Sequence, residues 1–496
     1  MKWRTLPLAG ALTVLPALAA AFPVTAIQQA GPVTQRFNVV ILGDGYTASE
    51  QAKLTSDAKA LVSELFDGAP YQPYRQLFNF KVIQSVSQDS GAAEDPDSGA
   101  PNTLFGAYYD CEGVSQLICV NEAAVLSAAA ADVPEFDLAL VVVNDSNYGG
   151  SGGDVPVVST DPDAAEILRH ELGHTLGHLA DEYSDPYPSY PPCSAAEDCT
   201  EPNVTLRNVR AQIKWLDWID PSTPVPTTGF NGVGLFEGAR YLSHGIYRPV
   251  DWNCKMQSLN LPFCPVCAEA LVRAFWNLKN VHLIDDADPP GDLATSRCVD
   301  TTFSVKTPSI TPSTLSVSWT VDNHPQAETS ASLMIPAGAL SAGAHIIVAT
   351  VNDATTLVRS DPQGKLSEAH AFTYRVPDCT MGAGGAAGAD TDGGAAGEGS
   401  ALPSAGGASA GAAHGGSGGR AGTAGTGGDV GAGAPSLSSG GALAQVPSPP
   451  VEKVVGCGCH VGEREQGHAW GMAMALLGAV GLLRRRRGER PARISI

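Results

Sequence analysis

The sequence predicts an α/β domain with a mixed sheet in residues 27–290, then a small β-sandwich in residues 298–379 and a disordered spacer in residues 380–455. Three patterns predict this organisation. Apolar runs alternate with helical stretches in the first region, and the second has strand-like runs separated by turn residues. The third region is almost entirely Gly, Ala, Ser, Thr and Pro, a composition that cannot bury a core.

The first region has the elements of a sheet covered by helices, and it is long enough for a full core. Helices are expected near residues 48–66 and 121–131, and a third helix follows the last strand. The strands are FNVVIL at 37–42, FKVIQSV at 80–86 and DLALVVV at 137–143. Four glycines between 149 and 153 then indicate either an accessible sheet edge, where an extended substrate can pair, or a turn without a function.

The third helix carries the most informative segment, HELGHTLGHLADEY at residues 170–183. Residues four apart lie on one helix face about 6 Å apart along the axis, so His170 and His174 can bind one ion. Glu171 lies beside that face, where it can deprotonate a water on a zinc ion. The spacing predicts a hydrolytic zinc site. The alternative is a buried amphipathic helix with two core histidines.

Sequence signals also predict the limits of this helix. Thr160 and Asp161 are capping residues, and Pro162 suits the first turn. Glu166 adds negative charge near the positive end of the helix. Gly177 is the expected break, because glycine readily takes the left-handed conformation that ends a helix. The inward face is expected to consist of Ala165, Leu168, Leu172, Leu176 and Leu179.

The third protein ligand is expected among the residues after this break. On a straight helix His170 and His178 rise about 12 Å apart, whereas zinc–imidazole bonds are about 2.0 to 2.1 Å. His178 is therefore not expected to bind the same ion. Asp181 or Glu182 can swing back to complete the site. We favour Asp181, because two histidines and one carboxylate leave a fourth position open for water, as in catalytic zinc sites.

The segment HELGHTLGHLADEY resembles the active-site motif of the IgA-specific metallo-endopeptidase family of bacterial zinc peptidases, which is related in layout to the metzincins. The similarity covers most of residues 36–278, including NVVILGDGY, YGGSGG, FEGARY, YRP, and C-K-M followed by FCPVC. It implies a zincin (metzincin-like) fold in which Met256 forms a methionine turn beneath the zinc and A-D-E-Y supplies the third ligand. The chain departs from the metzincin pattern H-E-x-x-H-x-x-G-x-x-H, since Ala180 stands where the last histidine would be. Without the family, Met256 reads as an ordinary core methionine.

Residues 1–26 have the features of a signal peptide. Lys2 and Arg4 precede an apolar run, and small residues favour cleavage after Ala21 or Ala26. Export to an oxidising compartment agrees with the eleven cysteines of the chain.

Close pairs of cysteines predict local disulfides. These are Cys111 with Cys119 and Cys193 with Cys199, and a further pair, Cys298 with Cys379, brackets the β-sandwich. One disulfide partner stays unresolved among three further cysteines, Cys254, Cys264 and Cys267. For the C-x-x-C at 264–267 we favour a structural disulfide over a redox site or a second zinc site, because no second C-x-x-C accompanies it.

Residues 456–496 resemble a myxosortase-type C-terminal sorting signal. They contain G-C-G-C, an apolar run from Ala469 to Leu483, and four consecutive arginines. The resemblance implies processing by a sorting protease and display at the cell surface or outer envelope, or release from it. The alternative is a plain membrane anchor.

The net charge of −21 argues against nucleic-acid binding, which depends on lysine and arginine at the phosphates. Acidic segments such as Asp95 to Asp97 are candidates for structural Ca²⁺, although such loops are more often simply solvated.

These patterns predict an exported zinc metallo-endopeptidase that acts on a protein or peptide substrate. His170, His174 and Asp181 bind Zn²⁺, and Glu171 acts as general base. Tyr183 and Tyr247 are candidates for stabilising the oxyanion. The alternative is a surface adhesin with a protease-like domain that binds without cutting, although an intact Glu171 counts against it. The β-sandwich serves either as a binding module or as a support that stabilises the catalytic domain.

Overall fold

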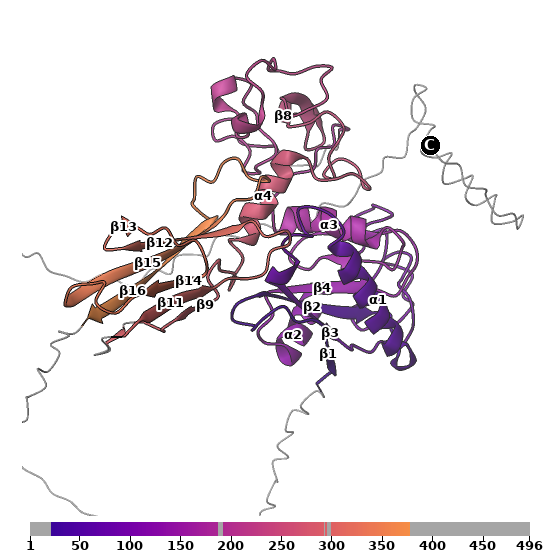
Figure 1. Cartoon of the computed structure of the whole chain (residues 1–496). Coiled ribbons are helices and arrows are strands. Elements are labelled where there is room, and N and C mark those ends of the chain that lie inside the picture. Colours follow the sequence, from indigo (N-terminus) through magenta and orange to yellow (C-terminus); the bar gives the residue numbers. More distant parts are fainter. Residues whose placement is uncertain (1–20, 187–191, 292, 295–298, 377–496) are drawn as a thin grey trace, which may run out of the picture. The chain divides into compact units, whose positions relative to one another are not determined.

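The computed structural model describes residues 21–186, 192–291, 293–294 and 299–376. Residues 21–284 form an α/β part and residues 286–376 form a β-rich part (Figure 1). The predicted α/β class with a mixed sheet is therefore confirmed. The spacer and the sorting tail expected for residues 380–496 lie outside the described residues, and so do residues 1–20 of the expected signal peptide.

A six-stranded mixed sheet, in the order β1-β3-β2-β4-β6-β5, forms the centre of the α/β part. The inner strands pair in parallel, whereas β1 and β5 run antiparallel at the two edges. Every residue of β2 and β4 is buried, as expected for strands covered on both faces. The strands are β1 (Val24–Gln28), β2 (Phe37–Asp44), β3 (Phe78–Ile83), β4 (Leu138–Val143), β5 (Gly150–Ser151) and β6 (Val157–Val158).

Helices cover both faces of this sheet (Figure 1). Side chains alternate along a strand, and the odd-numbered apolar residues of β2 pack with α1 and α3 while the even-numbered ones pack with α2. The helices are α1 (Gln51–Leu65), α2 (Glu122–Asp132), α3 (Ala164–Thr175) and α4 (Pro265–Phe275), and a hairpin of β7 (Phe236–Ala239) and β8 (Leu242–Arg248) precedes α4. The strands and helices expected before residue 143 are thus present, although the second strand lies at 78–83 instead of 80–86.

The β-rich part contains a five-stranded sheet, β10-β16-β15-β12-β13, and a three-stranded sheet, β14-β11-β9. Phe303 of β11 meets Phe372 of β16, with 5.2 Å between ring centroids, so the two sheets share buried side chains. The strands are β9 (Asp286–Asp288), β10 (Leu293–Ala294), β11 (Thr301–Lys306), β12 (Leu315–Val321), β13 (His324–Pro325), β14 (Ser332–Ile335), β15 (Gly343–Asp353) and β16 (Ser367–Val376). Because β9 pairs with β11, the β-rich part begins before residue 298.

Two expected disulfides are present, Cys111–Cys119 and Cys193–Cys199. The expected pair Cys298–Cys379 lies outside the described residues. Among the described residues, none of the helices is long and apolar enough to cross a membrane.

Asp353 at the end of β15 joins the two parts. Its carboxylate accepts hydrogen bonds from the Tyr74 hydroxyl at 2.7 Å and from the Trp276 indole N–H at 2.8 Å, both of which belong to the α/β part. All three side chains are buried. A second link runs from the Arg359 backbone N–H to the Glu269 carboxylate of α4, at 2.7 Å. The β-rich part therefore supports the α/β part through buried polar contacts.

Replacing Asp353 by alanine should destabilise the protein by roughly 2 to 5 kcal/mol, because buried donors on Tyr74 and Trp276 would lose their acceptor. Urea denaturation followed by tryptophan fluorescence measures the change in the free energy of unfolding. Asp97→Ala, at an exposed position, serves as the control and should change it by less than about 0.5 kcal/mol. Equal stability of the two variants would show that this contact does not join the parts.

Candidate metal centre

The first two ligand candidates lie on α3, which begins at Ala164, later than the capping signals at residues 160–162 predicted. Asp161 instead accepts a hydrogen bond from the Asp163 backbone N–H at 2.8 Å, so it stabilises a turn before the helix. Pro162 is consequently outside the helix. The expected inward face is buried along its whole length: Ala165, Leu168, Leu172, Leu176 and Leu179 are at most 8% exposed.

The helix ends close to the expected place but through a different residue. His178, not Gly177, takes the left-handed conformation, with φ of 49°, and its N–H donates to the His174 carbonyl at 3.0 Å. Glycine is required at position 177 for another reason: a side chain there would collide with its neighbours. A Cβ there would lie 2.9 Å from the Gly173 carbonyl oxygen and 3.0 Å from Leu271. The exposed His178 is thereby directed away from the helix axis, and the chain turns back toward the histidines.

This turn brings Asp181 to the two histidines of α3. The Nε2 atoms of His170 and His174 are 3.2 Å apart, and Asp181 Oδ1 lies 3.1 Å from the first and 3.4 Å from the second. The His170 and Asp181 side chains are 1% exposed and that of His174 is 14% exposed, so solvent reaches the group at His174. The three residues favoured from the sequence are thus together in space.

The geometry fits one tetrahedral ion. Ligands at about 2.0 to 2.1 Å from zinc are separated by about 3.3 to 3.4 Å from each other at tetrahedral angles, which is close to the separations here. Neither carboxylate oxygen of Asp181 has a hydrogen-bond partner among the described residues. Burial opposes the charge, but the two imidazoles hold the pKa of the Asp181 carboxyl well below its usual range. A buried, ionised carboxylate between two imidazole nitrogens is the donor set of a divalent cation.

The opposite ring nitrogens fix the direction of both imidazoles. His170 Nδ1 lies 3.0 Å from the Lys255 carbonyl oxygen, and His174 Nδ1 lies 2.7 Å from that of Leu179. Each Nδ1 therefore carries the proton and leaves Nε2 free to bind a metal.

Met256, the residue expected to form the methionine turn, packs against Gly173 of α3. It is fully buried, and a Cβ on Gly173 would lie 2.7 Å from its sulfur. Its carbonyl accepts a hydrogen bond from the Glu182 N–H at 2.8 Å. The preceding Lys255 forms an ion pair with Glu166 of α3, so the segment contacts the helix at Glu166 and at Gly173.

Glu171 is fully buried and points toward the glycine-rich segment after β4. A Cβ on Gly152 would lie 2.4 Å from Glu171 Oε2, so only glycine leaves room for the carboxylate. Glu171 is adjacent in sequence to His170 yet is not part of the ligand group. The Glu171 carboxylate is thus held against Gly152 and outside the ligand group.

The sheet edge next to this segment is already covered at Gly150. The Gly150 N–H donates to the Gln116 carbonyl at 3.1 Å, and its own carbonyl accepts from the Ile118 N–H at 3.4 Å. Gly149 allows this approach, since a Cβ there would lie 2.8 Å from the Gln116 oxygen. An extended segment can therefore pair with this edge of the sheet only at residues beyond Gly150.

The two tyrosine candidates occupy different places. The centroid of the Tyr183 ring lies 6.2 Å from that of the His170 ring and 5.5 Å from that of the Tyr241 ring, and both pairs of rings are tilted. Tyr247 is buried in the hydrophobic core, and its backbone pairs with Thr205. Only Tyr183 is thus linked to a ligand residue by a described contact.

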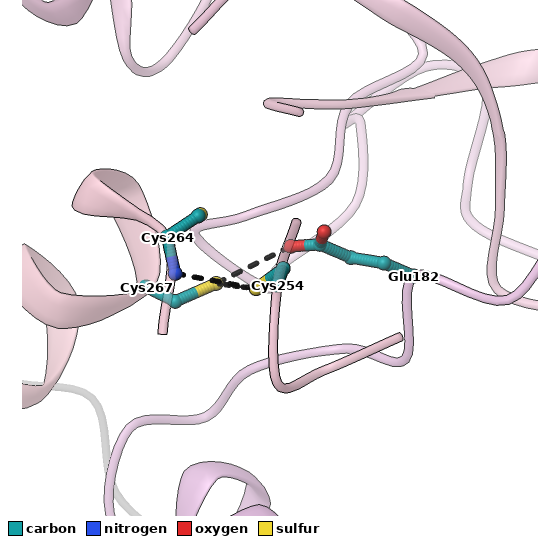
Figure 2. Close-up of side chains that lie close together, drawn as sticks. All are labelled: Glu182, Cys254, Cys264 and Cys267. Carbon is teal, nitrogen blue, oxygen red and sulfur yellow. Dashed lines mark hydrogen bonds between the residues drawn. The ribbon is translucent and has the colours of Figure 1, made fainter. Parts of the chain in front are cut away.

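Glu182, the other candidate for third ligand, points away from the histidines. It joins a second group that contains Cys254, Cys264 and Cys267, all buried (Figure 2). Burial raises the pKa of the Glu182 carboxyl well above its usual range, the opposite of the shift at its neighbour Asp181.

The C-x-x-C disulfide expected at 264–267 is not formed, because all three of these cysteines are free thiols. The sequence did not favour a metal site here, because the only signal was the single C-x-x-C at 264–267. Of the three possible ligand groups among the described residues, none contains Asp95 or Asp97, the proposed calcium ligands.

Comparison with known proteins gives one family. A family model described as IgA Peptidase M64 matches residues 25–232 and 228–275, about half of the chain. No curated protein matches. Among solved structures, one titled for the fibronectin(III)-like modules of CbhA from Clostridium thermocellum is similar to 18% of this chain over 94% of its own length, at 9% identity and a TM-score of 0.13.

Proposed function

The chain belongs to the IgA peptidase M64 family, which makes it a metallopeptidase, and on that premise we propose that it is a zinc metallo-endopeptidase with Glu171 as general base. The convergence of His170, His174 and Asp181 on one point carries this proposal. Three protein ligands leave the fourth tetrahedral position open, as in catalytic zinc sites. In this proposal the α/β part, residues 21–284, is a zincin-like catalytic domain, and the β-rich part, residues 286–376, is a β-sandwich that supports it.

Each residue has a defined task. His170, His174 and Asp181 hold the zinc, which when bound polarises the scissile carbonyl and lowers the pKa of a water to about 7. Glu171 accepts a proton from the attacking water and returns it to the leaving amine. Tyr183, beside His170, is the better placed tyrosine to donate a hydrogen bond to the oxyanion.

Removal of the metal tests the proposal against the adhesin alternative. A zinc chelator should abolish casein or gelatin hydrolysis in zymography, because no protein group replaces the Lewis acid, and added Zn²⁺ should restore it. A serine-protease inhibitor is the matched control and should change nothing. Hydrolysis that survives complete zinc removal would exclude this mechanism, and a zinc-loaded protein without any hydrolysis would favour the adhesin.

Export is part of the proposal, and the fold favours one cleavage position. The Phe22 N–H donates to Asp132 at 3.2 Å, and β1 pairs with β3 from Val24 onward. Cleavage after Ala21 preserves these contacts, whereas cleavage after Ala26 would remove most of β1. We therefore favour Phe22 as the first residue of the mature protein.

If residues 456–496 anchor the protein at the cell surface, changes in these residues should alter where the protein is found. Deletion of these residues should release active peptidase into the medium, because the apolar run and its arginines would be gone. Replacing Cys457 and Cys459 by alanine should instead leave an unprocessed, membrane-held precursor. Cell fractionation with intact-mass measurement checks both. A mature wild-type protein that keeps its arginine tail would favour a plain anchor, and a truncated form that stays cell-bound would place attachment elsewhere in the chain.

A further inference from the structure

The interior holds a second group of possible metal ligands beside the first. Glu182, Cys254, Cys264 and Cys267 each offer one ligand atom, and these atoms all lie within 4.8 Å of one another (Figure 2). They come from three segments: the residue after Asp181, the segment that leads to Met256, and the start of α4. All four residues are at most 2% exposed.

The separations match a tetrahedral ion. Cys254 Sγ lies 3.6 Å from Cys267 Sγ, and Cys267 Sγ lies 3.3 Å from Glu182 Oε1. With zinc–sulfur bonds of about 2.3 Å and zinc–oxygen bonds of about 2.0 to 2.2 Å, tetrahedral angles separate two sulfurs by about 3.8 Å and a sulfur from an oxygen by about 3.5 Å. A disulfide would need about 2.05 Å between sulfurs.

The protein alone does not satisfy this group. Three thiols can form one disulfide only, which would leave the third thiol and the carboxylate behind. Glu182 Oε1 accepts from Asn203 at 3.0 Å, but Oε2 is buried and has no hydrogen-bond partner among the described residues. The buried Arg248 lies near enough to feel the charge of Glu182, but its described ion pair is with Asp251 and its described hydrogen bonds go to backbone carbonyls and to Asp251. Burying such a set is costly unless a cation joins it.

We propose that Glu182, Cys254, Cys264 and Cys267 form a second, structural zinc site. Thiolates are soft ligands that select zinc among the common divalent ions. Four protein ligands close the tetrahedron and leave no position for water, in contrast to the three ligands around His170. In charge, three thiolates and a carboxylate equal the four-cysteine set of known structural sites. The inference does not depend on the proposed function.

The position of this site links it to the first one. Glu182 follows Asp181 directly, and Cys254 precedes Lys255, whose carbonyl orients His170. The Glu182 N–H also donates to the Met256 carbonyl. A zinc ion held here would fix both segments and so position Asp181 and His170 as ligands.

Metal counting tests the proposal on the full chain. Inductively coupled plasma mass spectrometry should find two zinc ions per chain in the wild type, one in His174→Ala and one in Cys264→Ser/Cys267→Ser. The matched control, Cys193→Ser/Cys199→Ser, removes two cysteines outside the group and should keep two. One zinc ion in the wild type, lost in His174→Ala, would overturn the proposal. So would a disulfide between any two of Cys254, Cys264 and Cys267 in a non-reducing peptide map.

A spectroscopic measurement covers the case in which the cysteine variant fails to fold. The variant His174→Ala, which empties the first site, is checked for the wild-type fold by circular dichroism and is then loaded with Co²⁺. Thiolate ligands should give strong sulfur-to-cobalt absorption in the near ultraviolet. Cobalt bound without that absorption, or no cobalt bound, would overturn the proposal.

Discussion

Glu171→Gln should keep the metal and lose at least about 100- to 10,000-fold in peptide hydrolysis, the usual contribution of a general base. Glutamine has the same shape, so it fits the space left by Gly152, and His170, His174 and Asp181 are untouched. It cannot accept the proton of the attacking water. Turnover of a fluorogenic peptide, measured beside zinc content, tests both halves of the expectation.

The same substitution at an exposed position controls for nonspecific effects. Glu64 lies on the surface of α1, and Glu64→Gln should retain wild-type turnover. If Glu171→Gln kept substantial activity, another group would have to act as the base. If it lost the zinc, Glu171 would have to be counted among the groups that hold the ion.

Asp181→Ala should weaken zinc binding at the histidine pair by more than about 100-fold, since even residues that only orient a ligand contribute about 10- to 100-fold. It removes one of three ligands and leaves a buried cavity between two imidazoles. Competition with a chelating dye measures the affinity. The expected loss is large because the alternative carboxylate, Glu182, points to the cysteines and cannot replace it.

Two neighbouring variants sharpen this test. His178→Ala should bind zinc like the wild type, because His178 is exposed and lies beyond the end of the helix. Glu182→Ala should lose the other ion and keep that of the histidine pair. Release of the histidine-bound zinc by His178→Ala alone would mean that the turn after α3 differs from the one described.

The sequence predicted those features that depend on local periodicity. The buried runs of β2 and β4 and the apolar face of α3 are continuous patterns, so their positions follow from the residues themselves. The spacing of His170 and His174 needs only the pitch of a helix. Features that depend on space at a turn were less accessible: the left-handed residue is His178, because packing against Gly173 and Leu271 decides the role of Gly177.

Long-range contacts set the limit of the sequence prediction. β1 joins the sheet only by pairing with β3, more than fifty residues away, and its short run lies where a signal peptide was expected. The cysteine cluster depends on Glu182 meeting Cys254 and α4, a proximity that no spacing within the chain reports. The turn at Gly177 and His178 also decides whether Asp181 or Glu182 faces the histidines, and the sequence does not report the path of that turn.

An uncovered sheet edge invites strands of other chains to pair with it and is a common origin of aggregation. In this protein the loop closed by Cys111 and Cys119 uses both backbone groups of Gly150, the outermost strand position on that side of the sheet. A strand from a second copy of the chain therefore finds no backbone N–H or C=O available for pairing at Gly150. The loop that covers this edge position thereby protects the protein against self-association there.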